Sequence, residues 1–362
     1  MGAVFTAEAG VNELEQRIDS LMQSRYGEDE PGAAVLIMKG DDVLFERYYG
    51  IADMETGEPV SSQTTFNIAS VSKQFTVVGA MTLQQKGLFS MNDTVARYFP
   101  EWESDIWQKV TFKHLASHTS GVPDTRDRSS REACVYADDS VSMSYIPHLT
   151  ELAFEPGEYY DYINPTFIIM ANAMERVTGI PFVQYQQKEI FDRCRMTKTY
   201  YFDPKATVPH QSHAYVPDEN GEWKQYDYGE ETFFATRPDG GIYSTARDMA
   251  KWEKALREGV VLNQHYLMRA YQPVISVADS PLCDYQRRPN TYYALGWFVD
   301  KTPGFPTKVY HTGDNGGYQA YVAKYPEHDV AIIVLENRND NDRWSMAVEI
   351  DAMLKDAGVF AD

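Results

Sequence analysis

Segments typical of β-strands stand at both ends of this 362-residue chain, and helical spacing dominates the part between them. Residues 31–53 form two apolar stretches around a Gly-Asp-Asp turn, which predicts a β-hairpin. Four β-rich stretches between residues 292 and 337 are separated by turn residues, which predicts several antiparallel strands. We therefore expect an α/β (α+β) fold, in which both chain ends build one antiparallel sheet flanked by helices and the middle forms an inserted helical lobe.

Helical spacing of apolar residues marks three regions. It predicts an amphipathic helix over residues 11–26, several helices between about residues 73 and 260, and a final helix starting near Asp342. No repeat, low-complexity tract or linker divides the chain. We expect a single domain over residues 1–362, with a sheet lobe at about 1–65 and 285–362 and a helical lobe at about 66–284.

The composition argues against several classes of partner. A net charge of −20 is unfavourable for binding nucleic acid, because phosphate contacts need a basic surface. No apolar run approaches the roughly 18 residues of a membrane-spanning helix. Neither a P-loop nor a dinucleotide-binding fingerprint occurs, and we expect no cofactor.

The cysteines and histidines do not form a recognisable metal motif. Cys134, Cys194 and Cys283 are too widely spaced for a zinc or redox motif, although one disulfide remains open. His114 and His118 have the spacing of two zinc ligands on one helix, but the glutamate that follows the first histidine in zinc proteases is missing. We therefore expect no metal.

A serine and a lysine stand three positions apart in "FNIASVSKQF", residues 66–75. Positions i and i+3 share one face of a helix, so the Lys73 amine can reach the Ser70 hydroxyl. A desolvated or charge-crowded lysine can take the proton of a serine and so create a nucleophile. The same spacing is also common for a capping serine and a solvated lysine. No G-x-S-x-G elbow occurs, which argues against an α/β-hydrolase.

Two further motifs follow along the chain. In "GEYYDYINP", Tyr162 and Asn164 place a phenol beside an amide, which provides a proton shuttle and a hydrogen-bonding clamp. In "YHTGDNGG", His311, Thr312 and Gly313 come at the end of a predicted strand, where backbone N–H groups can line an oxyanion site and the two polar side chains can contact a substrate. Each tripeptide alone is equally typical of a turn.

The order of these three motifs carries a resemblance. With the segments "LASHTSGVPD", "GGIYSTARDMAKW", "YALGW" and "AYVAKYPEHDVAIIVLEN", the chain resembles the serine β-lactamase and penicillin-binding-protein superfamily over nearly its whole length. Its motifs and segments most resemble those of class C β-lactamases, serine DD-peptidases and related esterases. This resemblance implies the β-lactamase/transpeptidase-like fold.

The resemblance also implies a role for each motif residue. Ser70 is the expected acyl-accepting nucleophile at the start of the main helix, and Lys73 the amine that deprotonates it or keeps the proton network charged. Tyr162 is expected to shuttle a proton to the leaving group, helped by the Lys73 charge, which should lower the proton affinity of the phenol. Asn164 is expected to hold the acyl-side carbonyl. The backbone N–H groups of Ser70 and Asp314 would form the oxyanion hole.

Two positions depart from the family pattern. The third motif begins with His311 where many β-lactamases have lysine, so the cation that would hold a substrate carboxylate is replaced by a group that can be neutral near pH 7. The second motif has Ile163 where the family usually has a small residue, so this side of the site is expected to have less space for a substrate. Efficient penicillin hydrolysis is therefore not expected.

We expect a serine hydrolase that cleaves an amide, peptide or ester through an acyl-enzyme, acting on a small molecule or a peptide. β-Lactams, D-Ala-D-Ala peptides, D-amino-acid amides and esters stay open as substrates, as do a catalytically silent binding protein and the oligomeric state. Arg126, Arg128 and Arg131 are candidate carboxylate ligands in a mixed-charge loop. The N-terminus lacks the features of a signal peptide, whereas the resemblance favours a periplasmic or extracellular protein.

Overall fold

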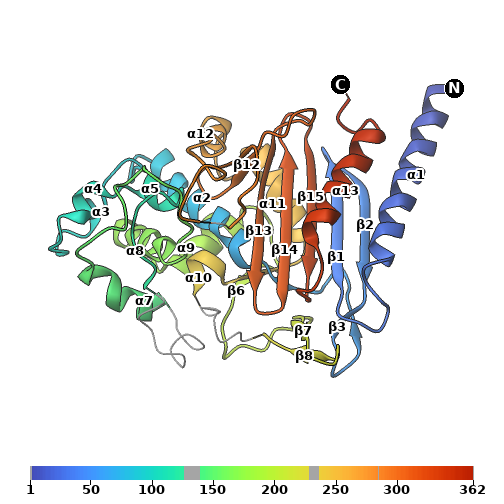
Figure 1. Cartoon of the computed structure of the whole chain (residues 1–362), viewed down its shortest axis with the longest axis horizontal. Coiled ribbons are helices and arrows are strands. Elements are labelled where there is room, and N and C mark those ends of the chain that lie inside the picture. The colour runs from blue at the N-terminus through green and yellow to red at the C-terminus, as the bar shows by residue number, and fades with distance from the viewer. Residues whose placement is uncertain (1, 126–138, 228–235, 284, 362) are drawn as a thin grey trace.

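An eight-stranded sheet forms the centre of the computed structural model, which describes residues 2–125, 139–227, 236–283 and 285–361 (Figure 1). The strand order is β10-β11-β12-β13-β14-β15-β1-β2, and every pairing is antiparallel. The strands are β1 (Ala33–Lys39), β2 (Asp42–Tyr49), β10 (Ile275–Ser276), β11 (Thr291–Tyr293), β12 (Phe298–Asp300), β13 (Lys308–Asn315), β14 (Tyr318–Tyr325) and β15 (Val330–Glu336). The predicted sheet built from both chain ends is confirmed.

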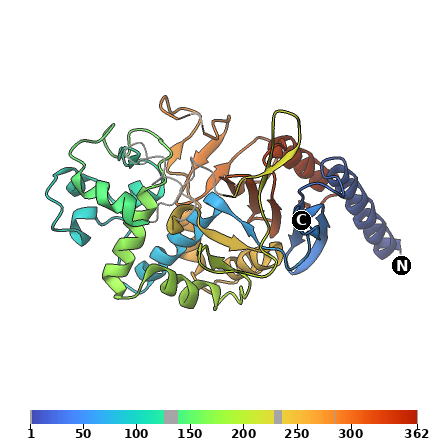
Figure 2. The same ribbon diagram turned by 90° about the horizontal axis from the view of Figure 1, so that it is seen from below.

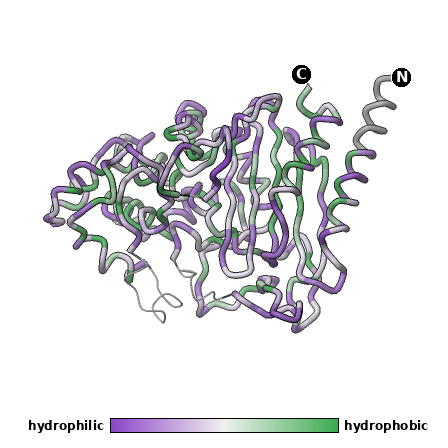
Figure 3. The backbone as a smooth tube through the Cα atoms, in the orientation of Figure 1, coloured by the Kyte–Doolittle hydropathy of each residue, from purple (hydrophilic) through white to green (hydrophobic). Residues whose placement is uncertain are grey.

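The side chains of the sheet alternate between two buried layers. In β1, Ala33, Val35 and Ile37 belong to one apolar cluster, while the residues between them belong to the other. Successive side chains of a strand point to opposite faces, so a strand that is covered on both sides is apolar throughout. Figure 3 shows this as hydrophobic residues running along the strands next to α13.

Two terminal helices cover one face of the sheet. They are α1 (Gly2–Gln23) and α13 (Arg343–Asp356), at the far end of the molecule from the helical lobe (Figures 1 and 2). Leu14 and Ile18 of α1 pack with Met346 and Ile350 of α13 in the same cluster. Asp342 accepts hydrogen bonds from two N–H groups of the first turn of α13, so the predicted start of this helix is confirmed.

The other face of the sheet packs against the helical part of the chain. Its helices are α2 (Ser72–Gln85), α3 (Val95–Tyr98), α4 (Ile106–Lys109), α5 (Phe112–Ala116), α7 (Asp139–Tyr145), α8 (Thr166–Thr178), α9 (Phe182–Gln186), α10 (Arg237–Gly240), α11 (Ala246–Arg257) and α12 (Gln264–Ala270). Shorter turns in the described residues are the 3₁₀ turns η1 (Ala69–Val71) and η3 (Ile146–His148) and the π-helical turn η4 (Gln187–Phe191).

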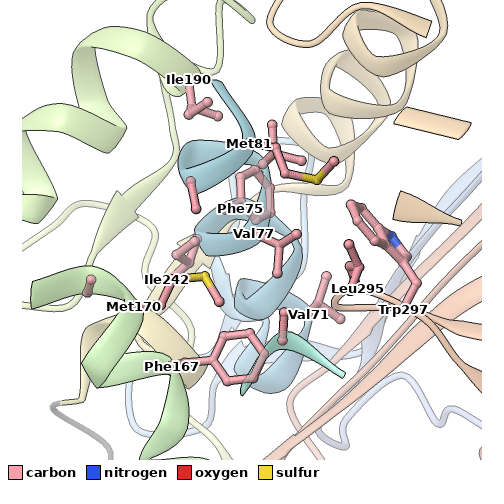
Figure 4. Packing of buried hydrophobic residues seen from close by; sticks show 14 of the residues in the cluster. Val71, Phe75, Val77, Met81, Phe167, Met170, Ile190, Ile242, Leu295 and Trp297 are labelled. Atoms are coloured by element: carbon pink, nitrogen blue, oxygen red, sulfur yellow. The ribbon is translucent and has the colours of Figure 1, made fainter. Parts of the chain in front are cut away.

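Helix α2 is the centre of this second core. All residues from Ser72 to Leu83 are buried, and Figure 4 shows side chains from several elements packed around Phe75 and Val77. The Phe75 ring stacks on Trp252 of α11 with 4.2 Å between centroids, and Trp252 Nε1 donates a hydrogen bond to Gln74 Oε1. A helix buried on all sides is held rigidly, which fixes the residues at its first turn.

In the part of the chain that the structure describes, seven short strands lie outside the large sheet, and apart from the first, which falls within the predicted hairpin segment, the sequence did not predict them. They are β3 (Ile51–Asp53), β4 (Glu58–Pro59), β5 (Phe66–Asn67), β6 (Tyr200–Tyr201), β7 (Tyr215–Pro217), β8 (Trp223–Gln225) and β9 (Ile242–Ser244). Strands β5, β9 and β6 form a small sheet in that order, and β5 leads directly into the turn that carries Ser70. Elements of two or three residues are too short to show a hydrophobic period.

Two of the three cysteines lie in the described residues. Cys194 is buried and Cys283 is half-buried, and these two do not form a disulfide with each other. Cys134 lies outside the described residues. In the same part of the chain, no helix has both the length and the hydropathy to cross a membrane.

Candidate active site

Ser70 lies in the turn η1 between β5 and α2, and it is partly exposed. The preceding residue, Ala69, has a φ of 45°, a left-handed conformation that costs energy for any residue with a side chain. Asn67 holds this turn, because its Oδ1 accepts a hydrogen bond from Ala69 N at 2.9 Å. The strained turn presents Ser70 just ahead of a buried helix.

Lys73 lies in the first turn of α2 and is completely buried. Its Nζ donates to Ser70 Oγ at 3.0 Å and to the carbonyl oxygen of Asp239 at 2.9 Å. The same nitrogen lies 5.0 Å from the ring centroid of Tyr162 and 5.4 Å from that of Phe167. The structure therefore brings the amine, the hydroxyl and the phenol ring together.

Tyr162 lies in the loop before α8, and its hydroxyl is buried without a hydrogen bond of normal geometry in the described part of the chain. Burial raises the pKa of Tyr162 well above its usual value, and the phenols of Tyr285 and Tyr293 raise it further. Interaction with Ser70 lowers this pKa, but by less. The net shift is therefore upward, because desolvation outweighs the interaction with Ser70, and the expected lowering by the Lys73 charge stays a prediction.

Asn164 follows two residues later, at the entry to α8. Its carbonyl oxygen accepts a hydrogen bond from Phe167 N at 3.1 Å. Its side-chain Oδ1 is buried and has no hydrogen-bond partner among the described residues. An unsatisfied amide oxygen can accept a hydrogen bond from a ligand that reaches it.

The third motif lies inside β13 and not at its end, because the strand continues to Asn315. Gly313 packs against the Ser70 turn: a Cβ added to it would lie 2.3 Å from the carbonyl oxygen of Ile68 and 3.0 Å from Ala69 Cβ. Only a glycine allows this approach. The edge of the strand is thus held against the turn that carries the hydroxyl.

His311 is fully buried, and both of its ring nitrogens are engaged within the protein. Nδ1 lies 2.6 Å from the carbonyl oxygen of Thr312, and Nε2 lies 3.0 Å from the hydroxyl of Tyr293. Burial and the Lys73 charge lower the pKa of His311 to about 3, so the ring is neutral near pH 7 as expected. The expected contact between this side chain and a substrate is not available, because neither nitrogen faces an open space.

Three residues without a recognisable motif surround Thr312 and Asp314. The hydroxyl of Tyr285 and Nε2 of Gln286 each lie 3.0 Å from Thr312 Oγ1. Arg343, at the start of α13, donates to the carbonyl oxygen of Gly313 at 2.9 Å and pairs with the Asp314 carboxylate at 2.8 Å. Only coordinates could show these contacts, since the partners are 26 to 30 residues apart in sequence.

The two histidines with zinc-like spacing are not on one helix. Helix α5 ends at Ala116, and His118 follows it with a φ of 56°. His114 Nδ1 instead accepts a hydrogen bond from Thr111 N as part of a helix cap. Within the described ranges, no group of three or more His, Cys, Asp or Glu side chains could hold a metal ion. The candidate carboxylate ligands Arg126, Arg128 and Arg131 lie outside those ranges.

Comparisons with known proteins agree with this geometry. The family model described as Beta-lactamase matches residues 14–352. Among curated proteins, the chain is similar to penicillin-binding protein 4* of Bacillus subtilis, with 26% identity over 92% of this chain and 74% of that protein. It is also similar to protein flp of Staphylococcus aureus, with 24% identity over 91% of this chain but only 64% of the length of that protein.

Solved structures show the same fold. A penicillin-binding protein from Bacillus halodurans matches with a TM-score of 0.77 and 24% identity, over 95% of this chain and 99% of that one. An octameric penicillin-binding protein homologue from Pyrococcus abyssi matches with a TM-score of 0.79 and 23% identity, over 96% of this chain and 77% of that one. The predicted fold is confirmed by these likenesses.

Proposed function

The chain belongs to the β-lactamase family, and we propose that it is a serine hydrolase that forms a covalent acyl-enzyme on Ser70. The observation that carries this proposal is the distance of 3.0 Å between Lys73 Nζ and Ser70 Oγ. A buried amine at hydrogen-bonding distance from a partly exposed hydroxyl is the arrangement that activates a serine. The buried phenol of Tyr162, which lies against the same amine, supports it.

In the proposed reaction, Ser70 Oγ attacks the carbonyl carbon of an ester or amide, and its proton passes to the Lys73 and Tyr162 pair, in which Lys73 Nζ accepts it as the neutral amine. The pair returns the proton to the departing oxygen or nitrogen, which leaves an ester bond between Ser70 and the acyl group. Water then attacks that ester, releases the acid and restores the Ser70 hydroxyl. Because the pKa of Tyr162 is raised, the phenol keeps its proton before the reaction begins. It acts as a proton donor and relay, and not as a phenolate base.

The remaining motif residues are proposed to hold the substrate. Backbone N–H groups of Ser70 and Asp314 would stabilise the oxyanion, and the amide of Asn164 would bind the acyl-side carbonyl. Strand β13, which carries the third motif, would lie along the substrate. Gly313 makes this possible, because it allows β13 to approach the nucleophile turn.

We further propose that the substrate presents an uncharged group to the third motif. The His311 ring is neutral, and the nearby Arg343 is already paired with Asp314. Lys73 is occupied by Ser70 and by the carbonyl oxygen of Asp239. A substrate carboxylate placed here would have to break one of these pairings, which costs more than the new contact returns.

A hydrolysis screen tests this proposal. It compares nitrophenyl esters with and without a carboxylate, D-amino-acid amides, D-Ala-D-Ala peptides and nitrocefin. The proposal predicts turnover of uncharged esters or amides with a kcat/KM above that of their carboxylated counterparts. Absence of turnover across the panel, together with reversible binding of one of its members, would instead indicate a catalytically silent binding protein.

A further inference from the structure

His118 occupies a constrained position beside the candidate active site. It lies in the turn after α5, is 1% exposed and has a φ of 56°. A positive φ is uncommon for residues other than glycine, although histidine adopts it more readily than most. A buried residue held in such a conformation indicates that the surrounding structure depends on where it points.

Two hydrogen bonds join His118 to the residues on either side of Tyr162. Asp161 N donates to the carbonyl oxygen of His118 at 2.9 Å, and Ile163 N donates to His118 Nδ1 at 3.1 Å. Between these bonds, the imidazole lies against the phenol ring, with 4.1 Å between centroids and 34° between planes. A single residue therefore holds the backbone before Tyr162, the backbone after it and one face of its ring.

The bond from Ile163 requires a neutral imidazole. Nδ1 can accept a hydrogen bond only when it carries no proton, so the proton is on Nε2. Nε2 is buried and has no hydrogen-bond partner in the described residues. Burial and the charge of Lys73 lower the pKa of His118 well below its usual value, so the acceptor is maintained at neutral pH.

We propose that His118 is a positioning residue that sets the distance between the Tyr162 phenol and the Ser70–Lys73 pair. Among the residues that the structure describes, none forms a hydrogen bond of normal geometry that could fix the Tyr162 hydroxyl, so contacts of its ring and backbone determine the place of the phenol. His118 contacts both. This inference deepens the proposed function and rests on it, since Tyr162 matters only if it moves a proton.

The test is a double-mutant cycle between His118→Gly and Tyr162→Phe. Glycine tolerates the left-handed backbone but removes the acceptor and the ring, so kcat/KM for an uncharged nitrophenyl ester should fall about 10²-fold, as for other small displacements of reacting groups. In the Tyr162→Phe background, the same change should cost no more than about twofold. An equal loss in both backgrounds would overturn the inference, because it would show a general structural effect.

His118→Asn provides a conservative rescue. Its Oδ1 can take the place of Nδ1 as acceptor, and asparagine tolerates a positive φ. We expect this variant to recover most of the activity that His118→Gly loses, with rates corrected for the folded fraction from thermal melts. If the glycine variant does not fold, a loss in His118→Asn as large as in Tyr162→Phe overturns the inference. A wild-type protein that neither turns over the ester nor labels at Ser70 would contradict the proposed function instead.

Discussion

Gly313 lies so close to Ile68 that a Cβ on the glycine would come within 2.3 Å of the isoleucine carbonyl oxygen. Gly313→Ala should therefore push β13 away from the nucleophile turn, lower the free energy of unfolding by about 1–3 kcal/mol and reduce ester turnover. Thermal or urea unfolding and kcat/KM measure both effects. Gly240→Ala is the matched control beside the same turn, because its Cβ would meet Ala69 only at 3.9 Å. Equal effects of the two changes would contradict this account.

Lys73 should be needed because its amine accepts and returns the Ser70 proton, and not only because it carries a positive charge. Lys73→Arg keeps a cation that does not lose its proton, so we expect kcat/KM to fall by about 10²–10⁴-fold, as in Lys73→Gln. Lys109→Gln is the control, since this lysine forms only an exposed ion pair with Glu155. Near wild-type turnover in Lys73→Arg would show that the amine does not take the proton of Ser70.

Tyr162→Phe should reduce the activity of the protein without reducing its stability. The variant keeps the ring but removes a buried hydroxyl that has no hydrogen bond of normal geometry to the described residues, so the free energy of unfolding should stay the same or rise. We expect kcat/KM to fall about 10²-fold or more because the relay is lost. Tyr160→Phe removes another buried hydroxyl without a partner and should leave kcat/KM unchanged. A fully active Tyr162→Phe protein would exclude the proposed relay.

The stability of the protein should fall on acidification, partly because of His311. Its pKa is about 3 in the folded protein and near 6.5 in the unfolded chain, so between these values the unfolded state binds more protons. Stability therefore rises with pH across this window, by up to about 1.4 kcal/mol per pH unit for this group. Urea unfolding between pH 7 and 4.5 should show a shallower slope for His311→Gln than for the wild-type protein.

Tyr293→Phe is the control for this pH dependence. It removes the hydroxyl that faces His311 Nε2 but keeps the buried imidazole, so most of the slope should remain. The pKa of Tyr293 itself is raised well above its usual value, and this phenol does not titrate in the window. Identical slopes for wild-type protein and His311→Gln would mean that the ring is protonated without difficulty in the folded state.

The fold could be predicted because its signals are local. The hairpin of β1 and β2 follows from two apolar stretches around a turn, and α13 follows from helical spacing and the cap at Asp342. The short strands β5, β6 and β9 could not be predicted, because only pairing between distant residues stabilises them. For the same reason, the sequence could not show that Gly313 packs against Ile68.

The candidate site was predictable in part. The proximity of Ser70 and Lys73 follows from helical spacing alone, whereas the hydrogen bonds that the neighbours of Tyr162 donate to His118 join residues 43 to 45 positions apart. The sequence also does not show the burial that raises the pKa of Tyr162. The roles of these residues stay predictions until activity is measured.

The most direct test of the central claim is the mass of the intact protein after exposure to a fluorophosphonate probe, followed by peptide mapping. We expect one covalent adduct on the peptide that contains Ser70, and no adduct in Ser70→Ala. The same substitution should abolish turnover of the nitrophenyl ester. An adduct on another residue, or undiminished labelling and turnover in Ser70→Ala, would contradict the acyl-enzyme account.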